Sequence, residues 1–222
     1  MMREIVLDTE TTGLRPYEGH KIVEIGCVEL INHVPTGNTF HCYINPKRSV
    51  PQEAYNVHGL STEFLSSFET FDVVAEEFLD FIKLDPLIIH NAPFDLGFLN
   101  FELKVVEREI LHHHKVIDTL KMARQMFPGS PASLDALCKR FKIDTTARTK
   151  HGAIIDCELL AEVYLDLIGG RQAGLALSKE KTITQEEGSS KKTLREPRAF
   201  PTNKEELEAH KAFMEKHILP NG

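Results

Sequence analysis

The stretch Ile5-Val6-Leu7-Asp8-Thr9-Glu10-Thr11-Thr12-Gly13 decides the fold and the site. Its three leading apolar residues predict a short buried strand. Residues i and i+2 of a strand point to the same side, so Asp8 and Glu10 should project together from its carboxyl end. Neighbouring carboxylates repel each other, more strongly when buried, unless a cation lies between them. Such paired oxygens suit Mg²⁺ or Mn²⁺, and an acidic turn after a strand is the alternative.

The composition is that of a globular protein. The chain has 222 residues, of which 41% are hydrophobic and 27% charged, and no apolar run approaches the ~20 residues of a membrane-spanning helix. The first residues carry an acid and lead into the strand, so we expect no signal peptide and a cytoplasmic location. The four cysteines show no CxxC spacing, which predicts reduced thiols rather than disulfides or a zinc site.

The net charge of −7 is unevenly distributed. Residues 1–168 hold 16 Lys and Arg against 25 Asp and Glu, a balance of −9, whereas residues 169–222 hold 10 against 8, a balance of +2. An acidic domain lacks the electrostatic footprint of a tight duplex binder. If it acts on nucleic acid, it should bind weakly and need metal ions or a partner that holds it near the substrate.

The order of the predicted elements indicates the fold class. A hairpin followed by alternating helices and strands predicts an α/β domain with a mixed sheet. We expect further strands at 21–31, 39–45, 86–90 and 115–118, a hairpin connection at 32–38, short or irregular helices at 51–68, and main helices at 71–82, 91–106, 134–141 and 152–168, with one more ending near 128.

The composition changes after Gly170. Residues 178–198 are polar and charged, which is typical of a flexible linker. Residues 203–219 regain helix formers, with Leu207 and Phe213 near one face. An apolar stripe at the end of a linker usually docks on a partner, and a frayed amphipathic tail is the alternative.

A second motif, Asn91-Ala92-Pro93-Phe94-Asp95-Leu96-Gly97-Phe98-Leu99, follows a predicted buried strand and begins a helix. The sites of α/β proteins gather at the carboxyl ends of strands. We therefore expect Asp95 to face the same end of the sheet as Asp8 and Glu10. Its alternative role is to complement the dipole of its own helix, with Asn91 as a helix cap.

A third motif, His151-Gly152-Ala153-Ile154-Ile155-Asp156, begins the last predicted helix. Five helical steps would put His151 and Asp156 about 140° apart. The two converge only if His151 lies just before the helix, where Gly152 permits a turn. Asp156 is an acid on an otherwise apolar helix, and a buried acid needs a partner. A capping or core histidine is the alternative for His151.

These motifs, in this order, resemble the DEDDh family of 3′–5′ exonucleases in the DnaQ-like superfamily, over residues 3–168. Several segments look like the proofreading subunits of bacterial DNA polymerase III within that family. These segments are EGHKIVEIGCVEL, VHG, NAPFDLGFL, SLDALC and HGAIIDCELLAEVYL. The resemblance implies a ribonuclease H-like mixed sheet, antiparallel at first and then parallel, flanked by helices and followed by a flexible C-terminal tail.

The resemblance also implies a metal-dependent active site. Asp8, Glu10 and Asp156 would bind two divalent ions, Mg²⁺ or Mn²⁺, and Asp95 would support them. Oxygen ligands suit these ions, and imidazole does so less well. His151 is therefore expected to be the general base that takes a proton from the attacking water.

The family likeness places the substrate on the same residues. Asp8, Glu10 and Asp156 would contact the terminal nucleotide. Glu53 and His58 would contact it as well, because they lie where members of the family bind the sugar and phosphate of that nucleotide. His58 as an ordinary loop residue is the alternative. The expected products are nucleoside 5′-monophosphates released from a 3′ end, by an enzyme that removes mispaired terminal nucleotides during DNA replication.

The resemblance divides the chain into three parts with separate partners. Residues 1–170 would be the exonuclease domain, and 171–198 a flexible linker with a sliding-clamp-binding motif at Gln172–Leu177. Residues 199–222 would dock on the catalytic alpha subunit of DNA polymerase III. Two rival hypotheses are an RNA-trimming 3′–5′ exonuclease of the same superfamily and a mainly structural polymerase-binding subunit.

Overall fold

A computed structural model describes residues 1–146, 150–169 and 203–217. These residues fall into two units, an N-terminal one that ends with the second range and a C-terminal one that holds a single helix. The predicted linker at 171–198 and the motif at 172–177 lie outside the described residues. Among the helices that are described, none is long and apolar enough to cross a membrane.

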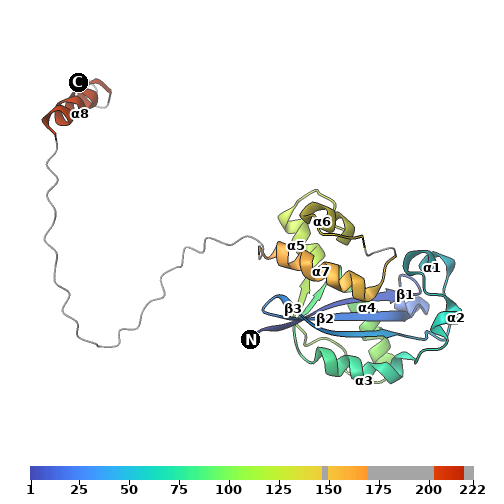
Figure 1. The fold of residues 1–222 in the computed structure, drawn as a ribbon. Coiled ribbons are helices and arrows are strands. Elements are labelled where there is room, and N and C mark those ends of the chain that lie inside the picture. Colours follow the sequence, from blue (N-terminus) through green and yellow to red (C-terminus); the bar gives the residue numbers. More distant parts are fainter. Residues whose placement is uncertain (147–149, 170–202, 218–222) are drawn as a thin grey trace, which may run out of the picture. The chain divides into compact units, whose positions relative to one another are not determined.

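The N-terminal unit is built on a mixed five-stranded sheet (Figure 1). The strands are β1 (Arg3–Thr11), β2 (Ile22–Ile31), β3 (Val34–Tyr43), β4 (Leu87–Ile89) and β5 (Val116–Asp118), in the spatial order β3-β2-β1-β4-β5. β1 pairs antiparallel with β2, and β2 with β3, whereas β4 is parallel to both β1 and β5. The predicted mixed sheet with an antiparallel beginning is confirmed.

Helices cover both faces of the sheet (Figure 1). Helices α3 and α4 pack on one face, and α5, α6 and α7 on the other. The helices of this unit are η1 (Pro16–Glu18), α1 (Gln52–His58), α2 (Thr62–Leu65), α3 (Phe71–Ile82), α4 (Ala92–Val105), α5 (Thr119–Met126), α6 (Leu134–Phe141) and α7 (Ala153–Leu167). The main helices lie where the sequence predicts them, and the segment at 51–68 forms α1 and α2.

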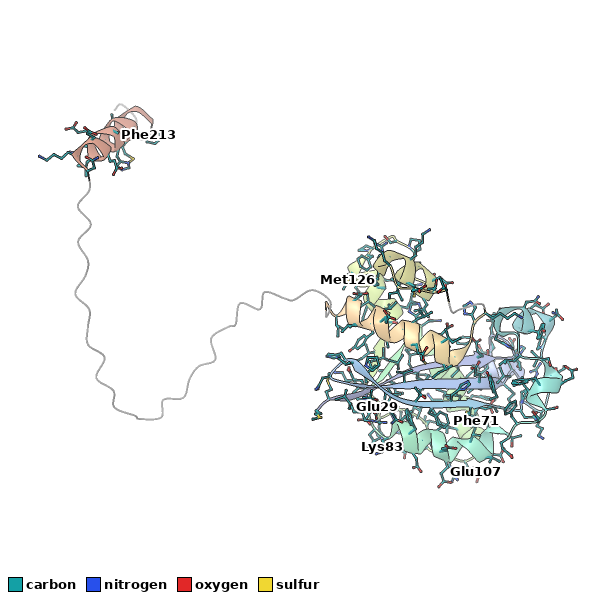
Figure 2. The ribbon with its side chains drawn as sticks, viewed as in Figure 1. Glu29, Phe71, Lys83, Glu107, Met126 and Phe213 are labelled. Atoms are coloured by element: carbon teal, nitrogen blue, oxygen red, sulfur yellow. The ribbon has the colours of Figure 1, made fainter. Side chains whose placement is uncertain are left out.

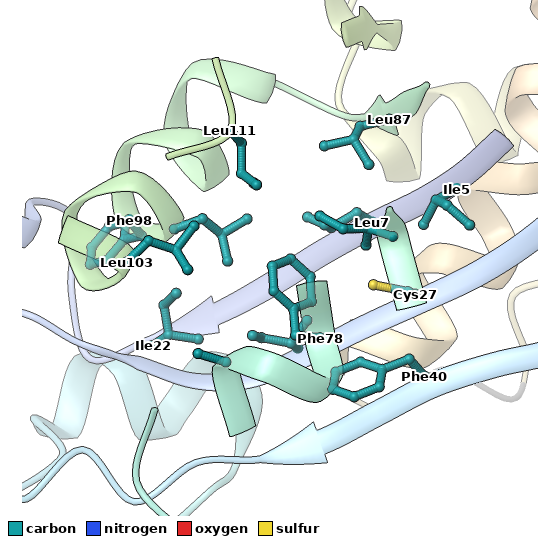
Figure 3. Packing of buried hydrophobic residues seen from close by; sticks show 14 of the residues in the cluster. Ile5, Leu7, Ile22, Cys27, Phe40, Phe78, Leu87, Phe98, Leu103 and Leu111 are labelled. Carbon is teal, nitrogen blue, oxygen red and sulfur yellow. The ribbon is translucent and has the colours of Figure 1, made fainter. Parts of the chain in front are cut away.

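Strand β1 is buried on both faces, and its alternation decides which way its acids point. Ile5 and Leu7 pack with Phe78 of α3 and Phe98 of α4 (Figure 3). Val6 packs on the opposite face, in the cluster that includes α7. Because side chains alternate along a strand, the even-numbered acids that follow Val6 point to the α7 face.

The predicted hairpin connection at 32–38 is wrong in its bounds. β3 already begins at Val34, so the turn between β2 and β3 is only Asn32-His33, with φ of 51° and 68°. Two adjacent left-handed residues match the twist of a tight hairpin. Pro35, which suggests a loop, is tolerated because β3 is the edge strand of the sheet.

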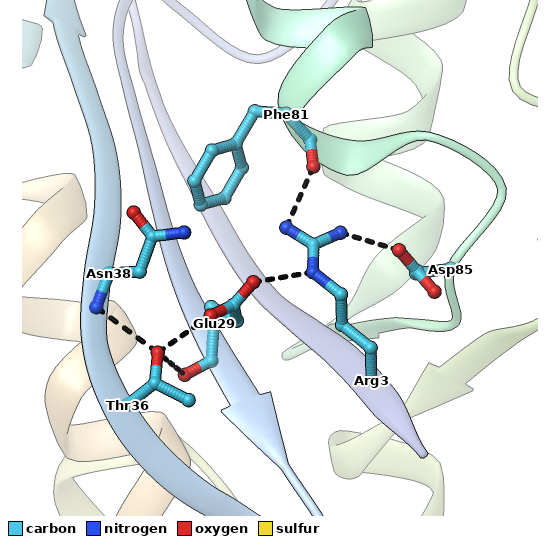
Figure 4. Close-up of polar contacts among 6 residues, drawn as sticks. All are labelled: Arg3, Glu29, Thr36, Asn38, Phe81 and Asp85. Carbon is cyan, nitrogen blue, oxygen red and sulfur yellow. Dashed lines mark hydrogen bonds and ion pairs between the residues drawn. The ribbon is translucent and has the colours of Figure 1, made fainter. Parts of the chain in front are cut away.

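Arg3 anchors the beginning of β1 (Figure 4). Its guanidinium pairs with Glu29 of β2 and with Asp85 in the connection before β4, and it donates to the carbonyl of Phe81 at 3.0 Å. The side chain is only 20% exposed. One cation therefore fixes three segments at the end of β1 that is opposite to the acids.

The C-terminal unit is the helix α8 (Lys204–His217). The helix predicted in this part of the sequence is confirmed over these residues. Leu207 and Phe213 are 44% and 55% exposed, and Phe213 projects from the helix in Figure 2. The helix thus carries large apolar side chains that are exposed.

We predict that Gly26→Ala destabilises the N-terminal unit, because α7 begins directly against β2 at this position. An added Cβ would lie 2.5 Å from the carbonyl carbon of Ala153, and such overpacking typically costs about 1–3 kcal/mol. Gly97→Ala on α4 is the control, since its Cβ meets nothing within 4 Å and alanine favours the helix by about 0.5–1 kcal/mol. Thermal unfolding of both variants tests this, and an unchanged midpoint for Gly26→Ala would contradict it.

Candidate active site

Four carboxylates meet at the carboxyl ends of β1 and β4. Asp8 and Glu10 come from β1, Asp95 from the first turn of α4, which follows β4, and Asp156 from the first turn of α7. Asp95 Oδ1 accepts hydrogen bonds from the backbone N–H of Thr9 at 3.0 Å and from its hydroxyl at 2.7 Å. The structure therefore brings together the three acidic motifs that lie far apart in the sequence.

His151 lies just before α7, as its spacing from Asp156 requires. Gly152 is the N-cap residue with an extended backbone, and His151 Nδ1 lies 3.2 Å from Asp156 Oδ2. The histidine side chain is 45% exposed, whereas that of Asp156 is 6% exposed. The backbone N–H of His151 also donates to the carbonyl of Val57 at 3.3 Å, which ties this segment to α1.

The carboxylates shift one another's pKa values. Burial raises the pKa of Asp8 well above its usual range, and the charges of Asp95, Glu10 and Asp156 raise it further. Burial also raises the pKa of Asp95 to about 7, although its hydrogen bonds from Thr9 oppose the shift. Without a cation, ionisation of these two carboxyl groups is therefore unfavourable. A bound cation would favour their ionised forms, as expected for a metal site.

The donor set fits a divalent metal ion. One ligand atom each from Glu10, His151 and Asp156 lies within 4.8 Å of the other two, and Asp8 is close enough for its pKa to respond to both of these acids. Buried carboxylate oxygens are the ligands that Mg²⁺ and Mn²⁺ prefer. The other described group of this kind, Glu109 with His112 and His113, is exposed.

A cavity of about 540 Å³ opens on the Glu10 side of the carboxylates. Glu53 of α1 and His58 at its end both line it, as do the apolar side chains of Leu14 and Phe94. His58 is 5% exposed, and burial lowers its pKa. Its Nδ1 accepts from the N–H of Leu60 at 3.0 Å, so the neutral ring carries its proton on Nε2.

A second cavity, of about 400 Å³, opens on the other side of the carboxylates. Asp8, His151 and Asp156 form one wall of it. The remaining lining comes from the residues directly after β4, from α5, and from the start of α6. These residues are His90, Asn91, Leu120, Arg124, Ser133, Leu134 and Asp135. The cluster of acids therefore lies between two cavities.

Sequence reasoning missed several residues of these cavities. Phe94 packs partly against the core and also lines the first cavity. Leu14 is 78% exposed, and a large apolar residue directly after the acidic motif was a usable signal. Thr9, which holds Asp95, and Arg124 of the second cavity gave no comparable local signal.

Comparisons with known proteins agree with this geometry. Residues 5–164 match the model of the exonuclease family. DNA polymerase III subunit epsilon from Rickettsia conorii (strain ATCC VR-613 / Malish 7) is 49% identical over 221 residues, covering 97% of this chain and 96% of that protein. The subunit epsilon from Escherichia coli (strain K12) is 46% identical over 225 residues, covering 96% and 92%.

A solved structure supports the fold. The nuclease domain of 3′hExo, described as a DEDDh family member bound to rAMP, superposes with a TM-score of 0.65 at 20% identity, covering 76% of this chain and 92% of that one. The fold is that of the DEDDh exonucleases, and the family is one of metal-dependent nucleases that cleave from the 3′ end. The chain belongs to this exonuclease family and, within it, to the epsilon subunits of DNA polymerase III, which are proofreading exonucleases.

We predict that Asp95→Asn stabilises the metal-free protein more at pH 8 than at pH 5. The Asp95 pKa of about 7 lies above the ordinary value of 3.8, so the folded state is penalised progressively as pH rises from about 4 to about 7. Asparagine cannot ionise, and its Oδ1 can still accept from Thr9. In urea unfolding with EDTA, the gain at pH 8 should exceed the gain at pH 5 by roughly 2–3 kcal/mol. An equal change at both pH values would contradict the shift.

Proposed function

We propose that this chain removes mispaired 3′-terminal nucleotides from DNA as 5′-monophosphates and acts as a subunit of a replicative DNA polymerase in the cytoplasm. The observation that carries the proposal is the convergence of Glu10, His151 and Asp156 within 4.8 Å, between two cavities that can hold the nucleotides on either side of a phosphodiester. The epsilon subunits to which it is similar are named as parts of DNA polymerase III.

Asp8, Glu10 and Asp156 would hold two divalent ions, Mg²⁺ or Mn²⁺, with Asp95 in support. When bound, such ions act as Lewis acids that lower the pKa of water and stabilise charge on the transferring phosphoryl group. Asp95 is held by Thr9 rather than exposed to a cavity. Its role would therefore be to hold the start of α4 against β1 and to add negative charge next to the metal ligands.

His151 would be the general base. Its Nδ1 faces Asp156, so an Nδ1–H donated to that carboxylate leaves Nε2 unprotonated and able to accept the proton of the attacking water. The oxygen of that water forms a bond to the phosphorus of the terminal nucleotide, while the bond from that phosphorus to the 3′ oxygen of the penultimate nucleotide breaks. The released 3′ oxygen then takes up a proton and becomes the new 3′ hydroxyl of the strand.

The first cavity would hold the terminal nucleoside. Leu14, Val57 and Phe94 offer apolar surface on which any base can stack. Glu53 and His58 would contact the sugar and phosphate, because both line the same cavity. Mismatched ends fray more easily than matched ones, so selectivity needs no readout of the base itself.

The C-terminal part of the chain would supply the attachment. The helix α8 exposes Leu207 and Phe213, and we assign it to docking on the polymerase catalytic (alpha) subunit. Gln172–Leu177 would bind the sliding clamp. An acidic nuclease domain binds DNA weakly by itself, and tethering raises the effective concentration of the DNA end.

We expect the purified protein to shorten a 5′-labelled DNA strand from its 3′ end with Mg²⁺ or Mn²⁺ and not with EDTA. Single-stranded and mismatched ends should be cut faster than a matched duplex. Asp8→Ala should lose the activity and keep binding to the polymerase subunit, because α8 is a separate unit. Faster cleavage of an RNA strand would favour the RNA-trimming alternative, and no cleavage of either strand would favour a mainly structural subunit.

His151→Ala is expected to lower kcat by about 10²–10⁴-fold, the usual contribution of a general base. The side chain is 45% exposed, so its removal should leave the fold intact. If Mn²⁺ binds the carboxylates, it should raise the melting temperature of the variant as much as that of the wild type. His112→Ala, at another exposed histidine, is the matched control. A His151→Ala variant with near-wild-type kcat would remove this residue from the mechanism.

A further inference from the structure

We propose that the second cavity binds the penultimate nucleotide of the substrate strand, with Arg124 contacting its 5′ phosphate. This inference rests on the proposed function, since it assigns a subsite of the same reaction. A 3′–5′ exonuclease must hold nucleotides on both sides of the scissile phosphodiester. The acids lie between two cavities, so one cavity serves the departing nucleotide and the other serves the strand that remains.

The lining of the two cavities decides which serves which. The first is the larger, and its apolar residues Leu14, Val57 and Phe94 suit a base. The second has the more polar lining of the two, and Arg124 is part of it; polar and cationic groups suit a sugar-phosphate backbone. The retained strand therefore leaves through the second cavity.

Arg124 is available for a phosphate. It is exposed on α5, and within the described ranges its guanidinium makes no hydrogen bond or ion pair. Arg15, which lines the first cavity, is instead paired with Glu18 at 2.8 Å. A guanidinium at the rim of an acidic site offsets the repulsion that a second phosphate would otherwise meet.

The structure also holds the helix that carries Arg124 against β4. His90 Nδ1 lies 2.9 Å from the hydroxyl of Thr119, which in turn donates to the carbonyl of Ile89 at 3.3 Å. These contacts fix the first turn of α5 to the end of β4. Asp135 is the acid in this lining that belongs to neither β1 nor α7, and it lies in the first turn of α6, where it complements the helix dipole.

Three substrates test the proposal. The thymidine dinucleotide with a 5′ phosphate carries the phosphate assigned to Arg124, and the same dinucleotide without it does not. The p-nitrophenyl ester of thymidine 5′-monophosphate lacks the penultimate nucleotide altogether. We expect Arg124→Gln to lower kcat/KM about tenfold on the phosphorylated dinucleotide and less than twofold on the other two substrates.

Two further variants complete the experiment. Lys121→Gln removes a positive charge from the same helix at an exposed residue that lines neither cavity, and it should behave as wild type on all three substrates. Arg124→Lys should restore part of the loss. On longer single strands, a plot of log kcat/KM against log salt concentration should also have a slope that is less steep by about 0.7 for Arg124→Gln. This is the change expected for one lost phosphate contact on a single strand.

Two outcomes would overturn the inference. An equal loss on all three substrates would mean that Arg124 only supports the fold of the site, and no loss on any substrate would mean that it does not contact the strand. Failure of the proposed function is a separate result, because the wild-type protein would then hydrolyse none of the three substrates with Mg²⁺ or Mn²⁺.

Discussion

Repulsion among buried carboxylates is the constraint on which this structure depends. The strand period places Asp8 and Glu10 on one side of β1, and the first turns of α4 and α7 add Asp95 and Asp156. Each helix presents the positive end of its dipole to the cluster, which offsets part of the repulsion. Burial nevertheless raises the pKa values of Asp8 and Asp95, and the charges of Asp95, Glu10 and Asp156 raise that of Asp8 further, so the offset is incomplete. A bound cation would supply the remainder.

Close contacts around the acids counter that repulsion. Gly26 lets the start of α7 approach β2 closely, and Cys157 Sγ lies 3.2 Å from the Gly26 carbonyl. At the far end of β1, Arg3 fixes the strand to β2 and to the chain before β4. Groups that repel one another remain together only when their backbones are held by contacts that do not involve them.

The sequence predicts the elements that carry the acids because their signals are local. Two-residue alternation orients Asp8 and Glu10, and helical geometry requires His151 to lie outside α7, as it does. The turn at Asn32-His33 was missed because Pro35 and Gly37 gave a stronger loop signal than the turn itself. Thr9 could not be predicted, since its role arises from its contact with the distant Asp95. The place of Arg124 in the second cavity depends on how α5, α6 and α7 pack together, which no local signal reports.

The two cavities are coupled through the backbone around His151. The N–H of His151, which is in the wall of the second cavity, donates to the carbonyl of Val57, which lines the first. Next to it, Lys150 Nζ lies 4.8 Å from the centre of the Tyr55 ring on α1. The helix that forms the wall of the first cavity therefore also positions the histidine. A change in α1 would consequently alter the position of His151 as well as the shape of the first cavity.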